Sequence, residues 1–151
     1  MIVVWGIAVL CTLFLSSCKR PEVLDNSTLV NSARNVALTF GPAYVPFFKE
    51  ANVSDVQVFK KKDYGGDSRP QIRKQIGRKF YTVTFTYDST AVKFDFGFAA
   101  KVRIWKDTGE PLDVIFGNGW GRNFFFLSFK EQTDHSANDY EKVASDSIVK
   151  V

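Results

Sequence analysis

The fold is decided by one alternating stretch, Lys79-Phe80-Tyr81-Thr82-Val83-Thr84-Phe85-Thr86-Tyr87. From Tyr81 to Tyr87 the odd-numbered residues are aromatic or β-branched and apolar, and the residues between them are all threonines. A period of two is typical of a β-strand, because successive side chains point to opposite faces of a sheet. The stretch therefore predicts a strand with an apolar face and a threonine face.

Similar alternation occurs on both sides of this strand and predicts further strands. The segments are 53–60 upstream and, downstream, 93–98 with Phe94, Phe96 and Phe98, 100–117 with a turn at 107–111, and 124–129 after a turn at 117–121. The turn at 107–111 makes residues 100–117 a hairpin. Residues 132–139 are predicted to be a loop, and 140–151 an edge strand or a loose end. Together these segments predict five or six mostly antiparallel strands.

One helix is expected before the strands, over residues 28–39. Its apolar residues recur at helical spacing: Leu29, Val30, Ala33, Val36, Ala37 and Phe40. Ser27 and Asn31 are the candidates for its N-cap, and Gly41-Pro42 would end it. The expected fold class is therefore α+β, with one N-terminal helix packed on a curled, mostly antiparallel sheet.

The amino terminus has the pattern of an export signal. Residues 2–14 are apolar and uncharged, Leu15-Ser16-Ser17-Cys18 follows, and the chain turns polar at Lys19. The apolar run is shorter than the roughly 20 residues of a membrane-spanning helix. An alternative is that residues 1–17 form a buried strand or a short membrane anchor and that Cys18 is a free thiol.

Leu15-Ser16-Ser17-Cys18 resembles the lipobox of bacterial lipoproteins. The resemblance implies a cleaved signal over 1–17, acylation of Cys18, a lipid anchor and tether over 18–27, and one small domain over 28–151. Its membrane partner would be reached through the acylated Cys18, because several acyl chains hold a protein far more firmly than one. The implied location is the bacterial cell envelope, and Lys19 after the cysteine favours the outer membrane. One feature departs from the pattern, since no Lys or Arg precedes the apolar run.

Basic residues gather in one segment, residues 60–79, which holds eight Lys and Arg against two Asp in a chain of formal net charge +4. One interpretation is a solvated loop. The other is contact with anionic lipid headgroups or an acidic envelope polymer through Lys60, Lys61, Lys62, Arg73 and Lys74. Nucleic acid is not an expected partner of an exported, lipid-anchored chain.

The glycine-rich segment 117–123 reads Gly-Asn-Gly-Trp-Gly-Arg-Asn. The segment that follows it is a predicted strand, so it lacks the helix N-terminus of a phosphate-binding loop. One interpretation is a turn with Trp120 packed against the sheet. The other is a recognition loop in which Trp120, Arg122 and Asn123 contact a ligand or partner.

Catalytic and metal-binding patterns are not found in the sequence. The one histidine, His135, stands beside Asp134 in a polar stretch without metal-ligand spacing, and no Gly-x-Ser-x-Gly elbow is present. Glu110 and Asp113 flank a turn, where an ion-paired surface role is common. We therefore expect no enzyme activity, no metal and no cofactor.

The order of elements, with the stretch from Lys101 to Glu110 and its Asp107-Thr108-Gly109-Glu110 turn, resembles cystatin-like and PepSY-like exported domains. The expected function is non-catalytic: a binding or accessory module for a protein or envelope ligand. The alternative, implied by the cystatin-like resemblance, is an inhibitor or immunity-type protein that neutralises a peptidase or toxin. A small hydrolase ranks last, and the oligomeric state stays open.

Overall fold

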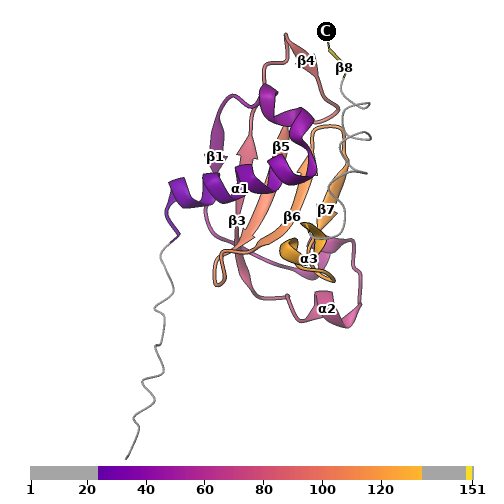
Figure 1. The fold of residues 1–151 in the computed structure, drawn as a ribbon. Coiled ribbons are helices and arrows are strands. Elements are labelled where there is room, and N and C mark those ends of the chain that lie inside the picture. Colours follow the sequence, from indigo (N-terminus) through magenta and orange to yellow (C-terminus); the bar gives the residue numbers. More distant parts are fainter. Residues whose placement is uncertain (1–23, 134–148, 151) are drawn as a thin grey trace, which may run out of the picture.

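The computed structural model describes residues 24–133 and the short strand β8. Within them a helix is followed by a run of strands, with short helical turns between (Figure 1). The elements are α1 (Asn26–Phe40), η1 (Pro42–Phe47), β1 (Ala51–Val53), β2 (Gln57–Val58), η2 (Lys61–Tyr64), α2 (Pro70–Arg73), β3 (Lys79–Phe85), β4 (Val92–Lys93), β5 (Ala100–Trp105), β6 (Pro111–Phe116), β7 (Gly121–Asn123), α3 (Phe129–Thr133) and β8 (Val149–Lys150).

The main sheet is an antiparallel meander in the order β1-β3-β5-β6-β7, with β2 also paired to β3. In its centre Val83 lies opposite Val102, and Val102 lies opposite Val114. This register aligns the apolar side chains of three strands on one face, which α1 covers. The α+β class, with one helix at the N-terminal end of the described region on an antiparallel sheet, is confirmed.

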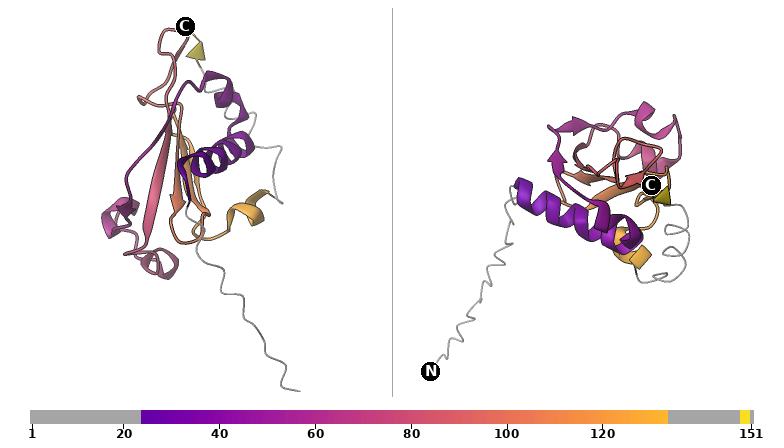
Figure 2. Two further views of the ribbon diagram at one scale, coloured as in Figure 1. Left: turned by 90° about the vertical axis from the view of Figure 1, so that its left-hand side faces the viewer. Right: turned by 90° about the horizontal axis from the view of Figure 1, so that it is seen from above.

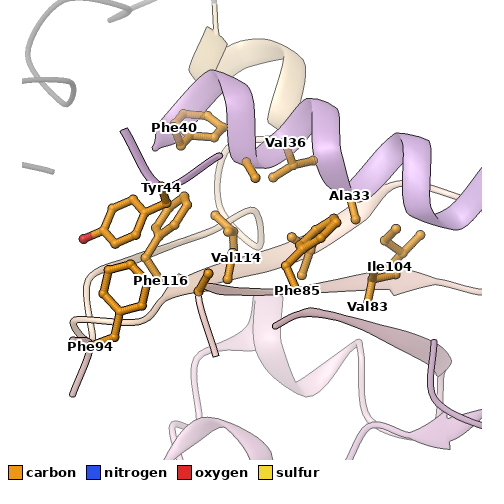
Figure 3. Close-up of a cluster of buried hydrophobic side chains, with 14 of the residues drawn as sticks. Ala33, Val36, Phe40, Tyr44, Val83, Phe85, Phe94, Ile104, Val114 and Phe116 are labelled. Atoms are coloured by element: carbon orange, nitrogen blue, oxygen red, sulfur yellow. The ribbon is translucent and has the colours of Figure 1, made fainter. Parts of the chain in front are cut away.

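The main core lies between α1 and the sheet (Figure 3). Ala33, Val36 and Phe40 point from the helix toward the sheet and are buried. The helix begins earlier than predicted, because its N-cap is Asp25, whose carboxylate accepts a hydrogen bond from the Thr28 N–H (2.7 Å). Residues 26 and 27 of the predicted tether therefore belong to the helix, which ends before Gly41 as expected.

A second core lies on the opposite face of the sheet, beneath the short helices η2 and α2 (Figure 2, left). Its buried members are Phe59, Ile72, Phe80, Trp105 and Leu112, with Tyr64 and Phe125 packed against them. The basic segment over residues 60–79 thus covers an apolar cluster of its own.

The predicted strand over 53–60 is broken into β1 and β2, which lie along the same edge of β3. Between them Ser54 replaces part of the backbone ladder: its hydroxyl accepts from the Thr82 N–H (3.0 Å), while its own N–H donates to the Thr82 carbonyl (2.9 Å). The alternation of burial is also lost locally, since Val56, Gln57 and Val58 are all exposed and Phe59 after them is fully buried.

The predicted strand over 93–98 is wrong beyond β4. Both edges of β3, the strand before this segment in the chain, are already paired, one by β1 and β2 and the other by β5, so the segment cannot add to β3. Its rings do not share a face: Phe94 is buried in the main core, whereas Phe96 is 47% exposed and stacks on Phe98.

The predicted strand over 124–129 is also wrong, because regular strand pairing ends with β7 at Asn123 and α3 begins at Phe129. Ser128 and Glu131 form a reciprocal cap at the start of α3. The Glu131 carboxylate accepts from the Ser128 N–H (2.8 Å), and the Ser128 hydroxyl accepts from the Glu131 N–H (3.3 Å). A Ser three residues before a Glu is the sequence signal of such a cap.

Candidate functional site

The basic residues named from the sequence all lie at one end of the sheet, the lower end in Figure 1. This basic end, as we name it, consists of residues 60–79 and the β5–β6 turn. Its exposed cations include Lys60, Lys61, Lys62, Arg73 and Lys74. The structure brings these five together because η2 and α2 both pack on the second core, through Tyr64 and Ile72.

The two acidic side chains of residues 60–79 are already engaged. Asp63 accepts from the Lys60 backbone N–H (2.6 Å), and Asp67 pairs with Arg69 (2.7 Å). The Arg69 side chain holds the pKa of Asp67 below its ordinary value by hydrogen bonding. Of the ion pairs between described residues, none includes the five cations named from the sequence.

A groove opens at the same end of the molecule, between residues 124–130 and the ends of β5 and β6. Its volume is about 390 Å³, within the range of small-ligand pockets. We call it the end groove; it is lined by Gln75, Arg78, Trp105, Glu110, Pro111, Phe124, Phe125, Ser128, Phe129 and Lys130. Four aromatic rings therefore stand beside a rim of amide, hydroxyl and charged groups.

Arg78 is a fixed part of the groove wall. Its Nε and Nη2 donate to the two carboxylate oxygens of Asp107 (3.0 and 2.6 Å), and its Nη1 donates to Gln75 (2.6 Å). The guanidinium lies 4.0 Å from the ring centroid of Trp105. Hydrogen bonding from Arg78 holds the pKa of Asp107 below its ordinary value.

Exposed apolar side chains lie in the loop that forms one side of the groove. Phe126 is 40% exposed and Leu127 is 50% exposed, and both fall between the lining residues Phe125 and Ser128. Arg69 stands over the Phe126 ring, 4.1 Å from its centroid. Large exposed apolar groups beside a concave aromatic surface are a feature of protein-binding sites.

The glycine-rich segment forms a tight turn and the edge strand β7, and it does not present its three candidate residues as one surface. Trp120 stacks on Phe116, with ring centroids 5.4 Å apart, and packs against the main core. Arg122 lies opposite Val114 in the sheet, whereas Asn123 lies opposite Asp113. Since neighbouring strand residues point to opposite faces, Arg122 and Asn123 are on different sides of the sheet.

The carboxylates flanking the β5–β6 turn do not form a pair. Asp113 is buried and bonded to Arg103, while Glu110 is exposed and lines the end groove. Among residues 24–133 and 149–150, no group of three or more His, Cys, Asp or Glu side chains is arranged to hold a metal ion. His135 and Cys18 lie outside the described residues.

Sequence reasoning missed the end groove. Its walls come from Arg78, Trp105 and Phe124, which are far apart in the chain and share no spacing pattern. The one local signal was the cap formed by Ser128 and Glu131, which shows that the Phe-rich run leaves the sheet.

No protein-family model, curated protein or solved structure matches this chain. In the part of the chain that the structure describes, no helix is both long and apolar enough to cross a membrane. The class that can be stated is therefore that of the fold, an α+β protein with an antiparallel sheet.

Proposed function

We propose that this chain is a lipid-anchored, non-catalytic binding or accessory protein of the bacterial cell envelope. The anchor is acylated Cys18, and the support for it is the apolar run 2–14 followed by Leu15-Ser16-Ser17-Cys18. The expected site is the outer membrane. The protein would bind its partner through the end groove.

The single observation that supports binding at the end groove is its combination of an aromatic lining with exposed apolar neighbours. The lining holds Trp105 and three phenylalanines, and Phe126 and Leu127 stand beside it with about half of their surface in water. Covering these groups removes apolar surface from water, which favours association by about 25 cal/mol per Å². The pattern favours a protein partner that inserts an apolar side chain among the rings.

The anchor is tested by the intact mass of the protein purified from membranes, beside a Cys18→Ala variant. We expect the mass of residues 18–151 plus acyl chains, and loss of both the acyl mass and membrane association in the variant. An unprocessed, unacylated mass would show that the amino-terminal run is structural or a membrane anchor.

The groove is tested by a photo-crosslinking amino acid placed at Lys130, which lines the groove, and at Lys93, an exposed lysine at the other end of the sheet. We expect a crosslinked partner from position 130 and none from position 93. Phe126→Ser with Leu127→Ser should remove the crosslink while the circular dichroism spectrum is retained. Equal crosslinking from both positions, unaffected by the double variant, would contradict binding at the groove.

The identity of the partner also separates the accessory role from the inhibitor or immunity-type role. An envelope peptidase or toxin whose activity falls when the protein is added, and recovers with the Phe126→Ser and Leu127→Ser variant, would indicate inhibition. A partner whose activity is unchanged or raised would indicate an accessory role.

A further inference from the structure

The described chain begins at the basic end of the sheet. Leu24, the first described residue, lies against the β5–β6 turn: a Cβ atom built on Gly109 would be 3.4 Å from Leu24 Cδ2. The same turn is tied to the basic segment, because the Lys106 N–H donates to the Lys79 carbonyl (2.9 Å) and Asp107 pairs with Arg78. The point where the chain enters the fold is therefore joined, through the β5–β6 turn, to Arg78 and Lys79 of the basic segment.

Only six residue steps separate Cys18 from Leu24. A chain extends by at most about 3.6 Å per residue, so acyl chains on Cys18 would hold Leu24 within about 22 Å of the lipid surface. This limit applies to the β5–β6 turn, because Leu24 contacts it. The opposite end of the sheet, where the chain leaves β3 near Ser89, has no such constraint.

The charge of the basic end suits an anionic surface. Lys60, Lys61, Lys62, Arg73 and Lys74 are exposed, and the carboxylates of their own segment are engaged by Arg69 and by the Lys60 backbone N–H. A Lys or Arg close to an anionic membrane adds about fivefold to the binding equilibrium. Several such residues together are enough to orient a tethered domain.

We propose that the basic end contacts the anionic phospholipid headgroups of the membrane that holds the Cys18 anchor, so that the domain has a fixed orientation on the bilayer. This inference rests on the proposed lipid anchor. The end groove opens at the same end, and a partner that binds there is met close to the lipid surface. The far end of the sheet points away from the membrane.

The test uses the mature acylated protein, in which Cys18 carries no free thiol, so one introduced cysteine can be labelled alone. A fluorophore is placed at Ser68→Cys in the basic segment or, as the matched control, at Ser89→Cys at the far end; both serines are exposed. Each protein is reconstituted into phosphatidylcholine vesicles with and without about 30% phosphatidylglycerol, which sets the surface charge. The readout is energy transfer to an acceptor on the headgroups.

We expect strong transfer from position 68 in the anionic vesicles, weaker transfer in neutral vesicles, and weak transfer from position 89 in both. The difference between the vesicles should shrink in about 0.5 M salt, where charges are screened beyond a few ångströms. Replacing Lys61, Lys62, Arg73 and Lys74 by Gln should reduce transfer from position 68 to its value in neutral vesicles. The control replacements Lys49→Gln and Lys93→Gln should leave it unchanged.

The possible negative results distinguish the proposed lipid anchor from the proposed orientation. An unacylated mass for the purified protein overturns the anchor and the orientation together. An acylated protein with equal transfer from positions 68 and 89, or with transfer that ignores lipid charge, overturns the orientation and leaves the anchor in place. Binding to a soluble acidic polysaccharide, with no difference between the two vesicles, would replace the lipid contact by an envelope polymer.

Discussion

The Arg103 guanidinium forms a hydrogen-bonded ion pair with the Asp113 carboxylate across β5 and β6, on the sheet face opposite α1. Arg103 Nε donates to both carboxylate oxygens (2.9 and 3.1 Å), and Nη2 donates to Oδ2. The two side chains are only 16% and 7% exposed, and the guanidinium stands 5.3 Å from the ring centroid of Phe80. The two residues also face each other at the last regular pair before the irregularity in β5–β6 pairing.

Removing one member of this pair should be costly, because the other charge would remain buried. We expect Arg103→Ala to lower the free energy of unfolding by about 3–5 kcal/mol, the range measured for broken buried ion pairs. The double variant Arg103→Met with Asp113→Leu should retain most of the wild-type stability, because apolar residues of similar volume replace the pair. Urea denaturation followed by fluorescence measures both. A double variant as unstable as Arg103→Ala would show that the ion pair itself stabilises the fold and that an unpaired buried charge is not the cause of the loss.

The same pair predicts a pH dependence. Burial raises the pKa of Asp113, and its hydrogen bonds with Arg103 oppose the rise. Because the folded pKa lies above the unfolded value, the folded state binds the proton more tightly, and stability falls as pH rises through the folded pKa. Without Arg103 the pKa rises further. The stability deficit of Arg103→Ala should therefore shrink as pH is lowered from about 7 to about 4, toward the unfolded pKa.

The quantity expected to change with pH is the difference in unfolding free energy between the wild type and Arg103→Ala. Asp67 and Asp107 have pKa values lowered mainly by hydrogen bonds from Arg69 and Arg78, so both proteins lose stability in acid as these groups are protonated. That loss is common to variant and wild type and cancels. Urea titrations at both pH values measure the difference, and a deficit of equal size at both would contradict the further rise in the pKa of Asp113 when Arg103 is removed.

Trp120 is the outer ring of an aromatic stack that starts in the main core. Tyr44 stacks on Phe116 at 4.6 Å between centroids, and Phe116 stacks on Trp120 at 5.4 Å. Since Trp120 is half-buried, we expect Trp120→Ala to lower the free energy of unfolding by about 2–3 kcal/mol, somewhat less than truncation of a fully buried ring. Denaturation and partner crosslinking of the same variant separate a structural role of Trp120 in the turn from a role in recognition of a partner. Unchanged stability with loss of binding would favour the recognition role.

The central part of the fold could be predicted because local and global signals agree there. In β3, Val83 and Phe85 lie on the sheet face that α1 covers, and the threonines that alternate with them lie on the opposite face. The same alternation at Phe94 and Phe96 predicts a strand that does not form, because the edges of β3 are occupied by other strands. Periodicity states which conformation a segment prefers and says nothing about whether a neighbouring strand is available.

The candidate site was predictable only in its charge. The run of basic residues after Lys60 is visible in the sequence, but its place at the same end of the sheet as the β5–β6 turn, which Leu24 contacts, depends on tertiary pairing. The end groove depends on Arg78 and Trp105, which meet through tertiary contacts alone. The sequence signal of α3, Ser128 followed by Glu131, was outweighed by the run of four apolar residues before it.

Position 41, at the end of α1, requires a glycine for a reason that the sequence did not indicate. Its φ of −153° is open to any residue, so a glycine is required because there is no space for a side chain. A Cβ atom at Gly41 would overlap the ring of Phe116, which is fully buried and stacked between Tyr44 and Trp120. The ring therefore has no free direction in which to move.

We expect Gly41→Ala to lower the free energy of unfolding by about 1–3 kcal/mol, as overpacking of a core does. Gly97 is the matched control, because a Cβ atom there would meet no heavy atom within 4 Å. Gly97→Ala should be neutral or slightly stabilising, since alanine restricts the unfolded chain more than glycine does. Thermal and urea denaturation of both variants decide the question. If the two substitutions had equal effects, the close approach of α1 to Phe116 would not be what requires a glycine at position 41.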